Sequence, residues 1–218
     1  MGEELQPKKR ILSISDSRVQ KLRESDERFN HVCKMVGDIE YHLSTDTYNF
    51  FISTFIGQML SNKAADAIYG RLAKLCHGTV NPSNVDILFD DEIRNIGISA
   101  QKLGYIRSFT DDILNNRIDI DRIAELDDDQ ALHELKKIKG VGDWSSKMYL
   151  LFVLDRQNVL PYEDVAFLQG YEWMSGTRDI NTLFKDAEKW QPFSSLVARF
   201  LYKALDGGFT KKPLSIRQ

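Results

Sequence analysis

Apolar residues recur at helical spacing along almost the whole chain, and this pattern limits the fold more than any other feature. The helical segments are short. Gly37 and Gly78 close two of them, and Ser61 and Ser99 precede two others as capping residues. Strand-like alternation is confined to ILSIS at residues 11–15. About ten helices joined by short loops predict an all-α fold, a compact two-lobed helical bundle.

Composition indicates a soluble chain with a real core. The 218 residues are 42% hydrophobic and 28% charged, which suits one large domain or two small lobes. The longest apolar run, residues 148–154, is too short to span a bilayer, and MGEELQPKKR has no apolar signal core. We therefore expect no membrane contact and a cytoplasmic location, near the nucleoid in a bacterium or nuclear in a eukaryote.

Cysteine and histidine usage excludes most metal cofactors. Cys33 and Cys76 are the two cysteines, and each lies in a helical apolar pattern typical of a buried, reduced thiol. Two thiolates cannot hold an iron–sulfur cluster of the four-cysteine kind. The four histidines are scattered and form no metal-ligand spacing. No cofactor is expected.

Charge is unevenly distributed. The net charge of -3 argues mildly against a nucleic-acid partner, and residues 119–129 hold six acids. Residues 134–149, however, hold four lysines against two acids, and the end of the chain is basic at Lys211, Lys212 and Arg217. A local basic surface on an acidic body is enough for a small phosphate footprint. An ordinary solvated face is the other interpretation.

The stretch KKIKGVGDWSSKMY, residues 136–149, places Gly140 and Gly142 between two helical segments. Glycine reaches positive φ at little cost and lets another backbone approach closely. Free N–H groups at the start of the second helix, with the positive end of its dipole, form an anion site that suits a phosphate. A simple corner between two helices is the structural alternative.

The surroundings of this hairpin resemble a known family. LHELKKIKGVGDWSSKMYLLFVLDRQNVLPYEDVAF is similar to the central segment of the helix–hairpin–helix DNA glycosylase superfamily, in its 3-methyladenine DNA glycosylase II branch. FIGQMLSNKAA, IGISAQKLGYIRSF and AEKWQPFSSLVARFLY resemble three further family segments, in the family's order. Ser194 departs from this pattern, because arginine is common there.

The resemblance implies a domain organisation. It predicts a glycosylase domain at residues 45–206 with its hairpin at 134–154, and an active site in the cleft between two lobes. Residues 1–44 form an N-terminal helical extension, and residues 207–218 form a basic C-terminal tail. Large members of the family carry an extra N-terminal sheet domain. Too few residues precede the match here for that domain, so we expect helices alone.

The resemblance also implies the chemistry. In the family, a proline after the hairpin leads to a pair of acids whose second member is catalytic, and here the pair is Glu163 and Asp164. A carboxylate at a helix start can stabilise positive charge on the sugar or deprotonate water. Simple helix capping is the alternative for Asp164. Glu163 is expected on another side of the same helix. Bifunctional members carry a lysine nucleophile where this chain has Trp144, which implies a monofunctional hydrolase.

The remaining site residues follow from matched positions. Trp144, Trp190 and Met148 are expected to contact the base, since indole rings attract cationic alkylated purines. Core packing is the alternative for Trp190, and Met148 stands where some members have a base-contacting tyrosine. Met59 is the candidate apolar wedge for the gap left by a flipped base. The alternatives are that Met59 is core and that Leu60 takes the exposed position.

The residues expected to contact DNA lie in the hairpin and around the wedge. They are Lys139, Gly140, Val141, Gly142, Lys147, Gln58, Met59 and Ser61. In relatives, hairpin carbonyls can hold a monovalent cation. By match, these would be the carbonyls of Lys136, Ile138 and Val141, holding a structural Na⁺ or K⁺.

The family resemblance therefore predicts a DNA glycosylase that flips out and hydrolytically excises alkylated purines, leaving an abasic site for base excision repair. The expected partner is double-stranded DNA that contains damaged bases, and the expected state is a monomer. The alternatives are the same fold acting on an oxidised or mismatched base, and a catalytically silent DNA-binding protein.

Overall fold

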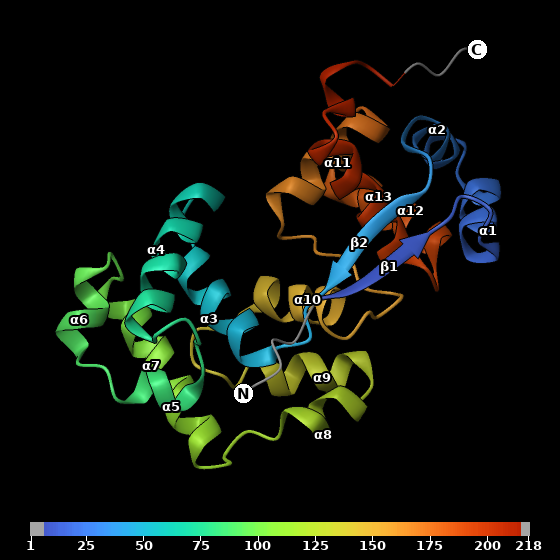
Figure 1. Cartoon of the computed structure of the whole chain (residues 1–218). Coiled ribbons are helices and arrows are strands. Elements are labelled where there is room, and N and C mark those ends of the chain that lie inside the picture. Colours follow the sequence, from blue (N-terminus) through green and yellow to red (C-terminus); the bar gives the residue numbers. More distant parts are fainter. Residues whose placement is uncertain (1–6, 215–218) are drawn as a thin grey trace. The chain divides into compact units, whose positions relative to one another are not determined.

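A computed structural model describes residues 7–214. Its helices are α1 (Ser17–Ser25), α2 (Glu27–Val36), α3 (Thr47–Gly57), α4 (Asn62–Leu75), α5 (Pro82–Asp86), α6 (Asp90–Asn95), α7 (Ala100–Leu114), α8 (Ile120–Glu125), α9 (Asp128–Leu135), α10 (Asp143–Phe152), α11 (Val165–Ser175), α12 (Ile180–Trp190), α13 (Ser194–Asp206) and the 3-10 helix η1 (Phe209–Lys211). Ten of these α-helices span at least eight residues, and α5, α6 and α8 span five or six. The predicted helical fold of about ten helices is therefore confirmed (Figure 1).

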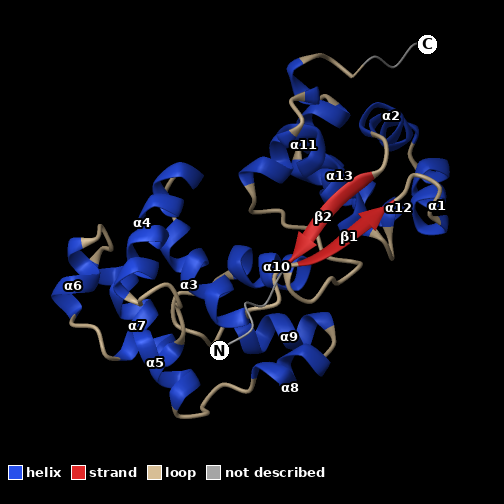
Figure 2. Ribbon diagram, viewed as in Figure 1, coloured by secondary structure: helices blue, strands red, loops and turns tan. Residues whose placement is uncertain are grey.

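Two strands correct the expectation that the N-terminal residues contain helices alone. β1 (Lys8–Leu12) pairs antiparallel with β2 (Ile39–Leu43), with Lys8 opposite Leu43 (Figure 2). The sequence of β2, IEYHL, buries its first and last residues and exposes alternate positions, which is the period of a strand. Five residues give a weak local signal, and the pairing partner lies beyond two intervening helices. Residues 1–6 and 215–218, including Arg217 of the predicted basic tail, lie outside the described residues.

The described chain divides into two compact units. Residues 44–146 form the first unit, which holds α3 to α9 and the start of α10. Residues 7–43 and 147–214 form the second unit, with the sheet, α1, α2, the rest of α10 and the last three long helices. The predicted glycosylase domain at 45–206 thus contributes residues to both units. Within the described range, no helix has the length and apolar character needed to cross a membrane.

An aromatic cluster joins α3 to α7 in the first unit. The ring of Phe109 lies 5.1 Å from that of Phe51 and 6.0 Å from that of Phe55, measured between centroids. The Tyr48 ring stacks on that of Phe109, with 5.7 Å between the centroids. All four side chains are buried. Aromatic pairs in these geometries stabilise packing beyond the area they bury, so the end of α3 is held firmly against α7.

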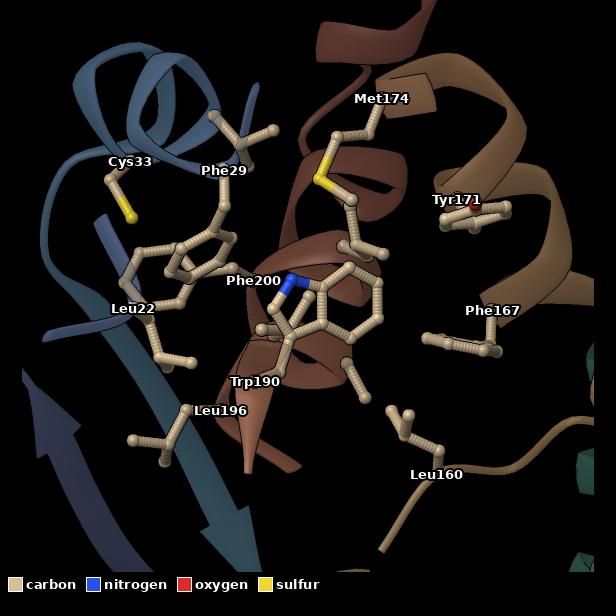
Figure 3. Packing of buried hydrophobic residues seen from close by; sticks show 14 of the residues in the cluster. Leu22, Phe29, Cys33, Leu160, Phe167, Tyr171, Met174, Trp190, Leu196 and Phe200 are labelled. Atoms are coloured by element: carbon tan, nitrogen blue, oxygen red, sulfur yellow. The ribbon is translucent and has the colours of Figure 1, made fainter. Parts of the chain in front are cut away.

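The core of the second unit surrounds Trp190. Figure 3 shows the indole between Leu22 and Phe29 on one side and Phe167 and Tyr171 on the other. Its Nε1–H donates to the Asp26 carboxylate at 3.1 Å, and this carboxylate also caps α2. None of the Trp190 surface is exposed. This indole is therefore a central element of the core.

Capping aspartates determine where two of the helices begin. Asp127 accepts from the N–H of Gln130 and caps α9, so the acidic stretch holds two short helices, α8 and α9. The helix after Pro161 was expected to include Glu163. Asp164 instead accepts from the N–H of Phe167, so α11 begins after it. Glu163 therefore precedes the helix.

Candidate active site

The turn between α9 and α10 contains both predicted hairpin glycines, and their surroundings differ. Gly140 has a φ of +90°, and a Cβ atom placed on it would lie 2.5 Å from Cγ of Tyr105 on α7. Gly142 is exposed and lies outside the positive-φ region, and a Cβ there would meet no heavy atom within 4 Å. The backbone and the Tyr105 ring thus require glycine at 140. The protein itself does not require it at 142, where an external group has room to approach.

The first turn of α10 is organised around Ser146. Its Oγ donates to the carbonyl oxygens of Gly142 and Asp143 at 2.9 and 3.0 Å, and its N–H donates to that of Gly142. The first N–H groups of a helix have no acceptor within the helix and lie at the positive end of its dipole. Val141 is buried beside them. An anion site at this turn stays a prediction.

The lysines of the hairpin region are mostly neutralised within the protein. Lys136 pairs with Asp143 at 2.9 Å, and Lys137 pairs with Glu134. Lys139 is exposed and has no ion-pair partner in the described part of the chain.

Lys147, which was predicted to contact DNA, forms an ion pair within the protein. Its Nζ lies 2.8 and 2.9 Å from the two carboxylate oxygens of Glu163, and its side chain is only 15% exposed. The ammonium group also lies over the ring of Tyr162, 5.0 Å from the centroid. This charge already has an acidic partner and is mostly buried, and a DNA contact of Lys147 stays a prediction.

The loop between α3 and α4 presents an apolar side chain to solvent. Met59 is fully exposed and has a φ of +59°, while Leu60 is 40% exposed. The alternative that Met59 belongs to the core is therefore wrong. Gln58 donates from Nε2 to the carbonyl oxygen of Gly140 at 2.9 Å, which ties the loop to the hairpin. Ser61 caps α4 by accepting from Ala64 N–H.

Asp164 occupies the N-cap of α11. Its Oδ1 accepts from the N–H of Phe167 at 2.7 Å and from the hydroxyl of Tyr202 at 3.1 Å. Helix capping was the alternative to a catalytic role, and the structure shows that Asp164 does cap the helix. A cap and a reactive carboxylate are compatible, because the capping bond fixes the direction of the side chain. The catalytic role of Asp164 stays a prediction.

Tyr202 supports this carboxylate from α13. Burial, and secondarily the neighbouring Asp164 charge, raise the pKa of the Tyr202 hydroxyl above its ordinary value, so it remains a proton donor. Its ring lies 5.8 Å from that of Phe152. The buried guanidinium of Arg199 lies 5.7 Å from the same Phe152 ring. Tyr202 is therefore held on a packed helix, and a packed support suits a residue that orients another.

The three aromatic and sulfur side chains expected at the base have different environments. Trp144, in the first turn of α10, is half-buried and keeps part of its surface accessible. Trp190 has no exposed surface, and Met148 is 7% exposed. A base stacks only on an accessible face, so the burial of Trp190 fits the core-packing alternative. Base contact by Trp144 and Met148 stays a prediction.

The predicted cation ligands are the backbone carbonyls of Lys136, Ile138 and Val141. The Ile138 oxygen already accepts from the N–H of Val141 at 3.0 Å, and a carbonyl has a second lone pair for a cation. The cation remains a prediction. Among the described residues, no three histidine, cysteine or acidic side chains gather where they could hold a metal ion.

Sequence reasoning missed three residues that fix candidate site residues, each within its own compact unit. Lys102 donates to the carbonyls of Ile56 and Gln58, Tyr105 packs on Gly140, and Tyr202 donates to Asp164. Lys102 and Tyr105 stand in the segment ISAQKLGYIRSF, at two positions that the family pattern itself specifies. That pattern was the available signal. It does not say which distant backbone each side chain contacts.

A glycine hairpin between two helices, followed by a proline and an N-capping aspartate, is the arrangement that the resemblance to helix–hairpin–helix DNA glycosylases predicts. The sequence matches no protein-family model. It is 30% identical over 187 residues to DNA-3-methyladenine glycosylase 1 of Schizosaccharomyces pombe, covering 82% of each chain. The chain therefore belongs to the DNA-3-methyladenine glycosylase family.

Solved structures agree with this assignment. A DNA-3-methyladenine glycosidase from Bacillus halodurans superimposes with a TM-score of 0.81 at 28% identity, covering 94% of this chain and 96% of that one. A 3-methyladenine DNA glycosylase of S. pombe, in complex with abasic DNA, superimposes with a TM-score of 0.76 at 25% identity. The match covers 91% of this chain and 98% of that one.

Proposed function

We propose that the chain is a monofunctional DNA glycosylase that excises alkylated purines from double-stranded DNA and acts as a monomer. The fixed carboxylate of Asp164 is the observation that carries this proposal. Two donors on different segments, Phe167 N–H and the Tyr202 hydroxyl, hold it in one direction. Trp144 stands where a lysine nucleophile would be needed for strand cleavage, which favours simple hydrolysis.

The damaged nucleotide must leave the duplex before its glycosidic bond can be reached. Flipping costs a few kcal/mol, and less for a damaged base. The exposed side chain of Met59 suits the gap that the flipped nucleotide leaves in the stack. The indole of Trp144, which is half-buried, suits a cationic purine, since cation–π attraction contributes roughly 0.5–2 kcal/mol.

Bond cleavage needs charge stabilisation more than it needs an acid. The C1′–N bond breaks with its electron pair passing to the base, so a cationic alkylated purine leaves as a neutral molecule. Positive charge develops on the sugar, and the Asp164 carboxylate stabilises it. Water then bonds to C1′ through its oxygen and gives up a proton, for which Asp164 is the acceptor.

In this proposal the hairpin binds the DNA phosphate. Gly142 offers open backbone, and Lys139 offers an exposed ammonium group without an internal partner in the described range. The first turn of α10 adds its N–H groups, and a monovalent cation on the carbonyls of Lys136, Ile138 and Val141 would add positive charge. Such a footprint is small, as the acidic body requires.

The test is Asp164→Asn with Glu163→Gln as its matched control. Asparagine keeps the shape of the side chain and can still cap α11, so the variant should fold and bind a duplex that carries an abasic-site analogue. Excision from methylated DNA should fall by at least about 100-fold, as when a group that stabilises transition-state charge is lost. Glu163→Gln should excise at close to the parent rate.

Three outcomes would change the proposal. Near-parent excision by Asp164→Asn would remove this residue from catalysis. Release of only oxidised or mispaired bases from a panel of damaged duplexes would redirect the same chemistry to another substrate. Binding without any base release would indicate a silent DNA-binding protein.

A further inference from the structure

The backbone at Met59 is unusual for a residue of its type. Its φ of +59° lies in the left-handed region, which costs a non-glycine residue free energy, and its side chain is fully exposed. Such a conformation persists when the surrounding structure determines it more strongly than local preference does. The contacts that determine it should therefore be visible around residues 58–60, the wedge loop.

Lys102 makes the contacts that hold this loop. From the first turn of α7, its Nζ donates to the carbonyl oxygens of Ile56 and Gln58, both at 2.8 Å. The Gln58 carbonyl belongs to the peptide that leads into Met59. The last carbonyls of a helix lack partners within it, and a cation there also interacts favourably with the dipole. Lys102 thus fixes the end of α3 and the start of the wedge loop together.

The environment of this ammonium group sets it apart from the other lysines. Lys102 has no carboxylate partner among residues 7–214, and its hydrogen bonds go to carbonyl oxygens. Burial lowers the pKa of the Lys102 ammonium group below its ordinary value. A lysine that served only solubility would extend into solvent. Lys102 instead donates hydrogen bonds to the backbone beside Met59.

The same face of α7 also contacts the hairpin. Tyr105, one turn after Lys102, packs its ring on Gly140, while Gln58 donates to the Gly140 carbonyl at 2.9 Å. The wedge loop and the hairpin are therefore joined through one side-chain hydrogen bond and one shared helix. All of these residues belong to the first compact unit, so the arrangement is internal to it.

We propose that Lys102 is a positioning residue that holds Met59 in the inserting conformation, with Gln58 linking the wedge loop to the phosphate-binding hairpin. This inference rests on the proposed role of Met59 as the wedge. The proposed role differs from that of a residue that only caps the end of α3. A cap stabilises the unit equally for every substrate, whereas a positioning residue matters most where a paired base must be displaced.

The variant to compare with the parent is Lys102→Met, which keeps the length of the side chain and removes the ammonium group. Lys102→Gln, which keeps donors, serves as a partial rescue and as a second variant if methionine prevents folding. Lys74→Met, at an exposed position in the last turn of α4, is the matched control. Met59→Ala reports on the wedge itself.

The first measurement does not depend on chemistry. A duplex with an abasic-site analogue carries 2-aminopurine beside the gap, and its fluorescence rises when a side chain disturbs the stack. The parent and Lys74→Met should bind and raise the fluorescence. Lys102→Met and Met59→Ala should bind with less rise, and Lys102→Gln should lie between. A full rise with Lys102→Met would overturn the inference, and so would a full rise with Met59→Ala.

The second measurement is single-turnover excision of one 7-methylguanine, either paired with cytosine or opposite an abasic-site analogue. Lys102→Met should slow excision from the paired duplex by about 10- to 100-fold, the size of effect that a small misplacement causes. It should slow the unpaired substrate far less, and adding Met59→Ala should bring little further loss. Equal slowing of excision from both substrates would show that Lys102 only caps α3, which would contradict the inference. If fluorescence behaves as expected but the parent excises nothing, the proposed function fails and the inference about Lys102 stands.

Discussion

Replacing Gly142 with valine tests the phosphate site with little disturbance to the fold. The position is exposed, its φ is not positive, and an added Cβ meets no heavy atom within 4 Å. We therefore expect the variant to unfold at close to the parent temperature. Removing a hydrogen bond to a charged group costs about 1.5–3 kcal/mol, which corresponds to about a 10- to 150-fold loss of DNA affinity.

Gly140→Ala is the matched comparison, because it should lower the stability of the fold, whereas Gly142→Val should lower the affinity for DNA. A Cβ there would lie 2.5 Å from Cγ of Tyr105, and the φ of +90° is unfavourable for alanine. Overpacking and backbone strain together should cost about 2–4 kcal/mol of unfolding free energy. The loss should be visible in urea or thermal unfolding before any DNA is added.

The assay is fluorescence anisotropy with two duplexes, one undamaged and one carrying an abasic-site analogue. Gly142→Val should weaken both by a similar factor, since phosphate contacts carry no base information. It should also leave the salt dependence nearly unchanged, because a backbone N–H carries no full charge. Normal binding of both duplexes by a folded Gly142→Val would show that the hairpin is only a corner between helices.

Three further results are expected. Trp190→Phe should destabilise the protein by about 1–3 kcal/mol, because the buried Asp26 carboxylate loses one of its donors, and excision per folded molecule should be unchanged. Folded Trp144→Ala should instead lose excision of damaged bases more than general DNA affinity. Unfolding curves, anisotropy and base release separate the two variants. Burial raises the pKa of Cys33 to about 12 from its ordinary 9.0, so the folded thiol keeps a proton that the unfolded chain loses. Stability should then fall as pH rises from 9 to 12, at up to about 1.4 kcal/mol per pH unit, and unfolding of Cys33→Ala should show a shallower fall. The logarithm of DNA affinity should fall against the logarithm of salt concentration with a slope shallower than about -8, and Lys139→Ala should reduce that slope by about 0.9; a steeper parent slope would reveal a larger basic face.

Local signals in the sequence were sufficient for the helical framework. Ser61 and Ser99 cap α4 and α7 as their positions before apolar runs predict, because capping depends on residues within one turn. The β1–β2 pair was not predictable in the same way. Its two strands are five residues each, and their pairing depends on a partner beyond two helices.

The candidate site shows the same limit. A matched motif could indicate Asp164 and the exposed Met59, since each was tied to a position in a family pattern. The motif could not show which of Trp144 and Trp190 is accessible, because a tryptophan in a pocket wall and a tryptophan in the core look the same in the sequence. Only the fold shows that Trp190 is enclosed.

Contacts between distant segments were also out of reach. Lys102 reaches backbone more than forty residues away, and Tyr202 reaches a carboxylate 38 residues away. No spacing rule within the sequence relates such pairs, because they depend on how the helices pack.

The most direct test of the proposed function is to identify what the parent protein releases from methylated duplex DNA. Mass spectrometry of the soluble fraction should find free alkylated purine, and the DNA should retain intact strands that break only on heating in alkali. No covalent adduct should form with borohydride, because Trp144 replaces the lysine that such trapping requires. Failure to release any base, or strand cleavage with a trapped adduct, would contradict a monofunctional alkylpurine glycosylase.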